Sequence, residues 1–366
     1  MILTETCGKK PVIGISIGDP SGIGPEICVK VLTLKEVYYA AIPVVYGDRV
    51  VLENALKITG SNFSVRRIEN PGEAEGNFGT IDFIDVGIIT RPDECTYGQI
   101  NAKSGDASFR YIVKAIDDAM SGALAAVVTC PISKEAINLA GHNFAGHTEI
   151  FAHYTNTADY GMMLSAKAGA AKAESAKACI ASIGENTLNV IHVTTHVSLR
   201  RACELVTKER VLKTIYLAQK ALTLMGIENG RIAVAGLNPH SSENGMFGNE
   251  ENDFIIPAIR EAVAQGMNVA GPLPPDTVFA KALGGQYDIV VAMYHDQGHI
   301  PLKLCGFKAS SGGVSGVRGV NATIGLPIIR TSVDHGTAFD IAGKNLADFH
   351  SLLDAIYMAV RFIKYR

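Results

Sequence analysis

The sequence predicts an α/β fold with mostly parallel sheets organised in two domains. Apolar strand-like segments alternate with amphipathic helix-like segments along the chain, which is typical of α/β architecture. The strand-like segments are almost continuously apolar, as strands covered on both faces should be. The chain has 366 residues, of which 47% are hydrophobic and 19% charged, and this size exceeds one ordinary core and suits two packed domains.

The expected elements follow from these patterns in chain order. The first strand is expected at 11–18, before the turn Asp19-Pro20-Ser21-Gly22, and a helix is expected from about Pro25 because proline is tolerated in a first helical turn. Further strands are expected at 41–47, 81–87, 123–130, 231–237, 287–294 and 322–333. Amphipathic helices are expected at 103–120, 207–226, 250–266 and 346–363.

Two segments are expected to lie outside this framework. Residues 166–182 are rich in alanine and lysine and are expected to form a solvated helical or flexible excursion. Residues 308–319 are rich in glycine and serine and are expected to form a mobile lid, with a direct phosphate contact as the alternative. Neither a Walker motif nor a Rossmann glycine fingerprint is present.

Composition and charge argue against several classes of partner. The formal net charge is -3 with no basic tract, so we expect no nucleic-acid binding. No apolar run reaches the ~18–20 residues of a membrane helix, and the N-terminal stretch lacks the layout of a signal peptide. Seven scattered cysteines without a CxxC pair are typical of reduced thiols, so we expect a cytoplasmic protein.

Histidines after predicted strands are the first candidates for chemistry. His196, His240 and His295 each follow such a strand, and the carboxyl ends of parallel strands form the ligand crevice of open α/β sheets. Three imidazoles with an open fourth position would suit a catalytic metal ion, although each histidine alone could be structural. His192 is expected to be structural. His299 is expected to follow a turn at Gly298 and to line the site without being a ligand.

Other polar residues are candidates for substrate contacts. His147 and Thr148 precede an apolar helix, and Thr148 could alternatively cap that helix. Lys303, Asn321 and Arg330 provide two cations and an amide near the last strands. Arginine and lysine commonly bind phosphate or carboxylate, and an unpaired buried cation at Arg330 would be costly.

Long ordered motifs carry a resemblance to a known family. The segments are GDPSGIGPEI, GHTEIFA, TTHVSL, GLNPHSSENG, GPLPPDTVF, MYHDQGHIPLK and VNATIGLPIIRTSVDHGTAFDIAGKN. From about residue 11 to the C-terminus, the chain resembles the 4-hydroxythreonine-4-phosphate dehydrogenases of pyridoxal phosphate biosynthesis. The resemblance implies a two-domain isocitrate/isopropylmalate dehydrogenase-like fold with the active site in the interdomain cleft. It suggests a cofactor-side domain of 1–129 plus 306–366, and a metal, substrate and dimerisation domain of 130–305.

The same resemblance implies roles for individual residues. The metal ligands would be His196, His240 and His295, holding one zinc, magnesium or cobalt ion per active site. The substrate contacts would be His147, Thr148, Lys303, Asn321 and Arg330. The cofactor, NAD or NADP, would bind the loop HGTAFDIAGKN through His335, Gly336, Ala338, Asp340 and Asn345. The resemblance also implies a homodimer with shared active sites. The family commonly has leucine where His299 stands, and 166–182 and 308–318 are longer than usual.

The implied reaction is the oxidation of 4-phosphooxy-L-threonine at C3 by NAD, followed by decarboxylation to 3-amino-2-oxopropyl phosphate. Asp276 and Lys134 are candidates for the base, and Asp296 could orient a metal-bound imidazole. Alternative substrates are four-carbon sugar-acid phosphates, such as threonate or erythronate 4-phosphate, and aromatic cis-diol acids. A non-redox protein that binds a phosphorylated metabolite and a metal-dependent hydrolase are the alternatives from other classes.

Overall fold

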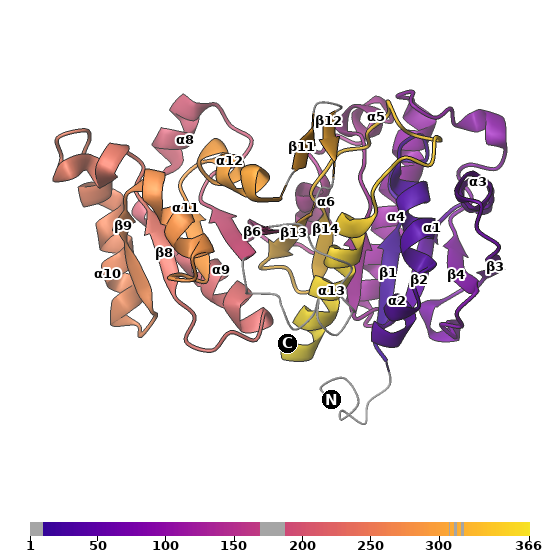
Figure 1. The fold of residues 1–366 in the computed structure, drawn as a ribbon, viewed down its shortest axis with the longest axis horizontal. Coiled ribbons are helices and arrows are strands. Elements are labelled where there is room, and N and C mark those ends of the chain that lie inside the picture. The colour runs from indigo at the N-terminus through magenta and orange to yellow at the C-terminus, as the bar shows by residue number, and fades with distance from the viewer. Residues whose placement is uncertain (1–9, 169–186, 307, 311–312, 316–317) are drawn as a thin grey trace. The chain divides into compact units, whose positions relative to one another are not determined.

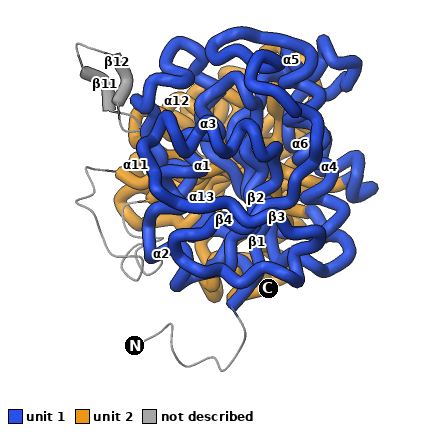
Figure 2. Tube along the Cα trace, turned by 90° about the vertical axis from the view of Figure 1, so that its right-hand side faces the viewer, with its two compact units in different colours: residues 1–158, 173–181, 326–363 blue, residues 159–172, 182–325, 364–366 orange. Residues whose placement is uncertain are grey.

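The computed structural model describes residues 10–168, 187–306, 308–310, 313–315 and 318–366. The chain forms two compact units (Figure 2). Unit 1 comprises residues 1–158, 173–181 and 326–363, and unit 2 comprises residues 159–172, 182–325 and 364–366. Strands and helices alternate in both units (Figure 1), which confirms the predicted α/β class. The units divide the chain at 158/159 and 325/326, whereas the sequence prediction placed the boundaries at 129/130 and 305/306.

The described residues of unit 1 form six strands, which run in the order β3-β4-β2-β1-β5-β14 and pair in parallel throughout. Their bounds are β1 Val12–Ser16, β2 Ile42–Gly47, β3 Ser64–Arg67, β4 Thr80–Asp85, β5 Ala126–Thr129 and β14 Arg330–Val333. Every residue of β5 and β14 is buried, as expected for central strands covered on both faces.

The helices of unit 1 are α1 Gly24–Leu32, α2 Lys35–Ala40, α3 Arg49–Thr59, α4 Ala102–Met120, α5 Lys134–Leu139, α6 His147–Tyr154 and α13 His350–Tyr365, with short 3-10 turns η1 Pro71–Glu73 and η2 Pro92–Glu94. Two helices of unit 1, α4 and α5, begin with side-chain caps and pack closely on each other. Asn101 caps α4 by accepting from the Ser104 amide, and Ser133 caps α5 by accepting from the Ala136 amide. A Cβ on Gly105 would lie 2.0 Å from the Ala136 carbonyl oxygen, so only glycine lets α4 approach α5 this closely.

Unit 2 contains a second, mixed set of strands in the order β13-β6-β7-β10-β8-β9. Their bounds are β6 Gly161–Lys167, β7 Thr187–His192, β8 Ile232–Ala235, β9 Val269–Leu273, β10 Ile289–Ala292 and β13 Gly319–Ile324. The strand β6 pairs antiparallel with both β13 and β7, and the remaining pairs are parallel. Its helices are α8 Leu199–Leu205, α9 Lys208–Leu224, α10 Ile256–Ala264, α11 Pro275–Leu283 and α12 His295–Gly306, with η3 Pro239–Glu243 and the π-helical turn η4 Glu251–Ile255.

The structure corrects several sequence predictions. The predicted strand 322–333 is two strands, because Gly325 adopts φ +111 and ends β13 before β14 begins. The segment 308–319, predicted as a loop, contains the antiparallel hairpin of β11 Lys308–Ser310 and β12 Gly313–Ser315. No bounds were predicted for the strands β3, β6, β7 and β9, and β9 contains both glycine and proline. Most of the predicted 166–182 excursion lies outside the described residues.

Two compositional predictions concern the described part of the chain. None of its helices combines the length and hydrophobicity needed to cross a lipid bilayer. Its cysteines, namely Cys28, Cys95, Cys130, Cys203 and Cys305, are free thiols.

Candidate functional site

The helix α12 begins directly after β10 with His295 and carries much of the candidate site of unit 2. The expected turn at Gly298 is wrong, because residues 295–306 form a continuous helix that places His299 one turn after His295. The two imidazole rings stack, with centroids 3.6 Å apart and planes 12° from parallel. The ring nitrogen Nδ1 of His299 lies 3.0 Å from the His295 carbonyl oxygen, to which it can donate.

Gly298 is required by tertiary packing. A Cβ at this position would lie 2.4 Å from His192 Nε2 and 2.7 Å from Val190 Cγ1. Glycine therefore lets α12 rest directly on β7, and this close approach is why a residue that usually weakens helices stands inside one. The side chain of the preceding residue, Gln297, donates to the Gly236 carbonyl after β8 and accepts from the Met293 amide. These bonds fix the start of α12 against the carboxyl ends of two strands.

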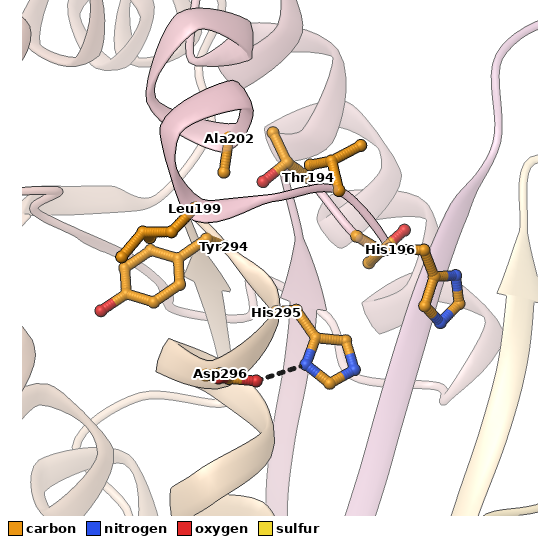
Figure 3. Close-up of a pocket in the computed structure, with 9 residues that line it drawn as sticks. Thr194, His196, Leu199, Ala202, Tyr294, His295 and Asp296 are labelled. Atoms are coloured by element: carbon orange, nitrogen blue, oxygen red, sulfur yellow. Dashed lines mark hydrogen bonds and ion pairs between the residues drawn. The ribbon is translucent and has the colours of Figure 1, made fainter.

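His295 is oriented by its neighbour Asp296 (Figure 3). His295 Nδ1 lies 2.7 Å from Asp296 Oδ1. An ionised carboxylate can only accept a hydrogen bond, so Nδ1 carries a proton, and in a neutral ring Nε2 is then the nitrogen with the lone pair. A carboxylate that holds the far nitrogen of an imidazole is the arrangement found behind metal-binding histidines. This hydrogen bond is consistent with the prediction that Asp296 orients the imidazole of His295.

His196 lies beside His295 in one pocket (Figure 3). The ring centroids are 5.7 Å apart. The pocket has a volume of about 260 Å³ and is lined by Thr194, Thr195, His196, Val197, Leu199, Ala202, Tyr294, His295 and Asp296. Thr194 donates to the Met293 carbonyl at 2.9 Å and so ties the segment after β7 to the end of β10. His196 itself has φ +52, a strained conformation for a residue other than glycine.

His240 lies in the segment after β8, on η3. It begins a run of five consecutive residues, 240–244, with φ between +47 and +66, which is unusual for side chains other than glycine. The segment is anchored by Asn238, whose backbone and side-chain amides donate to Glu251, with a further bond to Glu250. Within the described residues, no three His, Cys, Asp or Glu side chains are arranged to hold a metal ion. The three-histidine metal site therefore stays a prediction.

Four histidines of unit 2 form what we call the histidine cluster: His192, His196, His295 and His299. His192 is buried at the end of β7, as expected of a structural residue, and its ring lies 4.7 Å from that of His299. Neither ring nitrogen of His192 makes a hydrogen bond of good geometry, and burial is the main cause that lowers its pKa to about 3. Burial likewise lowers the pKa of His299 to about 4.

Imidazole is a ligand that zinc and cobalt accept, so the side-chain chemistry of this cluster suits such an ion. Neutral imidazoles provide nitrogen lone pairs, which suit zinc and cobalt and do so without bringing charge into the site. Lys303 follows His299 after one further turn of α12, so the helix presents His295, His299 and Lys303 at intervals of four residues. The positive charge of Lys303 contributes to the lowered pKa of His299.

A group of anion-binding candidates lies in unit 1 around Arg330. This residue is in β14 and only 2% exposed, and its Nη2 donates to Thr129 Oγ1 at 3.0 Å. The guanidinium carbon lies 5.6 Å from the centre of the Phe151 ring. Burial lowers the pKa of Arg330 to about 9, while the charge of Glu149 acts in the opposite direction. A cation destabilised by burial in this way would be stabilised by a bound anion.

His147 and Lys134 lie near Arg330. His147 begins α6 after Gly146, so Gly146 and not Thr148 occupies the cap position, and Thr148 is the second helical residue. His147 is half-buried, but its Nε2 atom is buried and makes no hydrogen bond. Burial first, and then the charges of Arg330 and Lys134, lower the pKa of His147 well below its usual value. Lys134, the exposed first residue of α5, therefore lies close enough to influence His147.

The predicted cofactor residues His335, Gly336, Ala338, Asp340 and Asn345 lie in the loop between β14 and α13. This loop is held by Glu26 of α1, which is fully buried. Its carboxylate accepts hydrogen bonds from the Gly343 amide and, at 3.1 Å, from the Asn345 amide. Ala338 and Asn345 have positive φ values of 42 and 59, so their backbone conformation depends on such contacts.

Sequence reasoning missed the buried carboxylates Glu26 and Asp19, although both stand in the quoted GDPSGIGPE motif. Asp19 is fully buried after β1, where Oδ1 accepts from the Ser21 amide at 2.9 Å and Oδ2 has no hydrogen-bond partner. Burial raises the pKa of Asp19 to about 6. The signal that could have identified these residues was a carboxylate placed inside an apolar, glycine-rich segment.

The candidate residues divide between the units. Unit 2 contains the three metal candidates with Lys303, Asn321, Asp276 and Asp296, and unit 1 contains His147, Thr148, Arg330, Lys134 and the cofactor loop. Asn321 is in β13, paired with Leu164 of β6, and Asp276 is exposed in the first turn of α11. The helix α11 contacts η3, which carries His240.

Known proteins match this chain over nearly its whole length. The family model described as "Pyridoxal phosphate biosynthetic protein PdxA" matches residues 39–359. A Cupriavidus necator protein named D-threonate 4-phosphate dehydrogenase is 46% identical over 347 residues, which are 94% of this chain and 95% of that protein.

Solved structures agree with these matches. A 4-hydroxythreonine-4-phosphate dehydrogenase from Klebsiella pneumoniae is 42% identical, covers 96% of this chain and 99% of its own, and gives a TM-score of 0.79. A 4-hydroxythreonine-4-phosphate dehydrogenase from Burkholderia phymatum is 43% identical, covers 97% and 99%, and gives a TM-score of 0.76. The resemblance carried by the sequence motifs is thereby confirmed. The chain belongs to the pyridoxal phosphate biosynthetic protein PdxA family.

Proposed function

We propose that this PdxA-family dehydrogenase oxidises the C3 hydroxyl of a four-carbon, 4-phosphorylated hydroxy acid with NAD and that the product then loses carbon dioxide. Oxidation at C3 places a ketone β to the carboxylate, and such an acid decarboxylates to a three-carbon ketone phosphate. The observation that carries the proposal is family membership, supported by relatives that are 42–46% identical over almost the whole chain and are named for substrates of this class.

Within this class we favour D-threonate 4-phosphate, with 4-phosphooxy-L-threonine as the second candidate. The two molecules share the C4 phosphate, the C3 hydroxyl and the C1 carboxylate and differ only at C2, which carries a hydroxyl or an ammonium group. The five proposed substrate contacts include two cations, Lys303 and Arg330, and no carboxylate. A substrate without an ammonium group suits such a set better, because like charges repel. The name of the 46% identical relative supports the same choice, and the names of the solved structures favour the second candidate.

The chain's own residues have separate tasks in this proposal. Lys303 and Arg330 bind anionic ends of the substrate, and the neutral His147 can accept or donate a single hydrogen bond through its buried Nε2. Lys134 is the candidate for the base that we favour, because its charge acts on His147, and Asp276 in the first turn of α11 is the alternative. The loop 335–345, held by Glu26, would bind the cofactor, which supplies the hydride acceptor when bound.

His196, His240 and His295 would hold the divalent cation, and Asp296 would orient His295. Such an ion, when bound, polarises substrate oxygens and lowers the pKa of a bound hydroxyl. Zinc, magnesium and cobalt are all candidates. The homodimer with shared active sites that the sequence resemblance implies belongs to the same proposal, and sedimentation velocity of the full chain would test it.

The decisive experiment measures NADH formation with D-threonate 4-phosphate, 4-phosphooxy-L-threonine, erythronate 4-phosphate and the unphosphorylated acids, with and without a chelator. We expect NADH with at least one phosphorylated acid, loss of the rate on chelation, and release of one carbon dioxide per NADH. Phosphate release without NADH would favour a hydrolase. Tight binding of these acids without either product would favour a non-redox binding protein and contradict the proposal.

Two variants test the assigned residues. His240→Ala should lose most bound metal and most turnover while circular dichroism shows a folded chain, and His350→Ala serves as the matched control. Arg330→Lys keeps the charge but loses the planar fork, so KM for the phosphorylated substrate should rise roughly tenfold or more. Arg260→Ala, on the exposed face of α10, is its control. Unchanged metal content in the first variant, or unchanged KM in the second, would refute the corresponding role.

A further inference from the structure

We propose that His299 is an additional ligand of the divalent cation and that it forms, with His295, a helical imidazole pair that favours zinc or cobalt over magnesium. The inference rests on the proposed metal site, to which it adds a donor and a preference among ions. It is carried by the geometry of α12 and of the histidine cluster.

The helix α12 presents two imidazoles in the spacing that helical metal sites use. His295 and His299 are four residues apart, so both rings project from the same face, where the centroids are 3.6 Å apart. Each Nδ1 already has a partner: that of His295 bonds Asp296, and that of His299 bonds the His295 carbonyl. In the neutral tautomers that carry the proton on Nδ1, both Nε2 atoms have a lone pair that can bind a metal ion.

The surroundings of His299 limit where its ring can go. The ring of the buried His192 lies 4.7 Å from it, centroid to centroid, and the ring of His295 stacks on it at 3.6 Å. His192 is fully enclosed and cannot retreat, because it lies at the end of β7 under the close approach of Gly298. A side chain that served packing alone would be better apolar here, since burying an imidazole removes it from water.

The present stack needs one adjustment to bind an ion. Two lone pairs in almost parallel planes converge on a single ion only after one ring rotates about its side-chain bonds. His295 is the ring with room to move, because its side chain is 37% exposed and borders the pocket of about 260 Å³. The centroid of the His196 ring lies 5.7 Å from that of His295. The result is a nitrogen-rich donor set, which zinc and cobalt accept and magnesium, a hard ion with oxygen ligands, does not favour.

The test measures metal affinity directly. Zn²⁺ and Co²⁺ affinities are determined by competition with a chromophoric chelator, and Mg²⁺ affinity by calorimetry, for the wild-type chain, His299→Leu and the control His350→Gln. We expect His299→Leu to weaken Zn²⁺ and Co²⁺ binding by roughly 10–100-fold, comparable with other losses of metal-site residues, and to change the visible Co²⁺ spectrum. The Mg²⁺ affinity of His299→Leu should change by roughly less than threefold, because magnesium prefers oxygen ligands. The affinities of the control His350→Gln for all three ions should also change by roughly less than threefold.

A second variant covers the case in which leucine disturbs the fold. His299→Cys replaces one metal-binding side chain with another, so it should bind Co²⁺ and add a thiolate-to-cobalt charge-transfer absorption that the wild-type chain lacks. Zn²⁺ and Co²⁺ affinities of His299→Leu within twofold of wild type, or a Co²⁺ complex of His299→Cys without the new absorption, would overturn the proposal.

The outcomes separate this inference from the proposed function. If the wild-type chain forms no NADH but His299→Leu still loses Zn²⁺ affinity, the dehydrogenase proposal fails and the ligand assignment stands. If NADH formation is chelator-sensitive and His295→Ala loses metal while His299→Leu does not, the function stands and the ligand assignment fails.

Discussion

The substitution Gly298→Ala tests how α12 is seated on the sheet of unit 2. By helix propensity alone, alanine should stabilise α12 by about 1 kcal/mol. The structure predicts the opposite sign. The new Cβ would lie 2.4 Å from His192 Nε2, 2.7 Å from Val190 Cγ1 and 3.1 Å from Ala292 Cβ. Since unstrained contacts between such atoms are about 3.5–4.0 Å, two of the three overlap by roughly 1 Å.

The strain must be relieved by movement of α12. Val190 and Ala292 belong to the adjacent buried strands β7 and β10, and His192 ends β7, so none of them can yield easily. Overpacking of this kind costs about 1–3 kcal/mol, which leaves a net loss of roughly 0–2 kcal/mol after the gain in helix propensity. A displacement of about 1 Å would also carry His295 and Lys303 with it, and misplacement on that scale can reduce a rate by about a hundredfold.

The assay combines urea unfolding followed by circular dichroism with NADH kinetics and Zn²⁺ competition. We expect the losses in kcat/KM and in Zn²⁺ affinity, each expressed as a free energy, to exceed the loss in the free energy of unfolding. The matched control is Gly72→Ala in η1, an exposed position of unit 1 where the nearest atom to the new Cβ is Asn70 Oδ1 at 3.1 Å. A Gly298→Ala chain that is more stable than wild type, with unchanged metal affinity, would refute the close approach of α12 to β7.

Three further predictions follow from other contacts. Burial raises the pKa of Asp19 from 3.8 to about 6, so the folded chain binds more protons than the unfolded chain between about pH 4 and 6. The free energy of unfolding therefore falls as the pH rises through that window. The shift corresponds to at most about 3 kcal/mol. Asp19→Asn should therefore be more stable than wild type above pH 6 and lose this advantage below pH 4 in urea titrations, and a pH-independent difference would contradict the assignment. Glu26→Gln turns an amide donor toward the Gly343 or Asn345 amide, so one of these two hydrogen bonds is lost. We therefore expect faster hydrogen exchange in 337–345 and a KM for NAD that rises roughly tenfold. An unaltered KM would count against the role of this loop in binding the cofactor. Asp296→Ala removes the acceptor that orients His295 and should weaken Zn²⁺ binding roughly 10–100-fold, whereas equal affinities would show that the bond is incidental.

Much of the fold could be predicted because hydrophobic periodicity is a local property. The buried strands β1, β2, β4, β5, β8 and β10 are apolar runs of the length that parallel sheets need, and the long helices α4, α9 and α13 have clear apolar faces. The strand β3, which was missed, lacks this signal. In β3 the residues are Ser64-Val65-Arg66-Arg67, whose strand conformation depends on pairing with β4.

The candidate site was predictable in part for the same reason. Polar residues after apolar strands pointed to His196, His240 and His295, and the motifs carried the family resemblance. The contact between His196 and His295 required the strand order that sets β7 next to β10, and the packing of His192 on His299 required α12 to lie on β7. Glu26 is separated from the amides that it holds by more than 300 residues, so no local pattern reveals that bond.

Gly298 shows where sequence reasoning reached its limit. Glycine suggested a turn, because it weakens isolated helices. In the tertiary structure residues 295–306 are nevertheless helical, since packing of α12 on β7 without a Cβ stabilises the chain more than the low helix propensity of glycine destabilises it. The sequence by itself determined the α/β pattern, the family and the residue types at the strand ends, because these depend on local periodicity and on ordered motifs. Only the tertiary structure decided which of those side chains meet, because contacts such as His192 with His299 join residues from different elements.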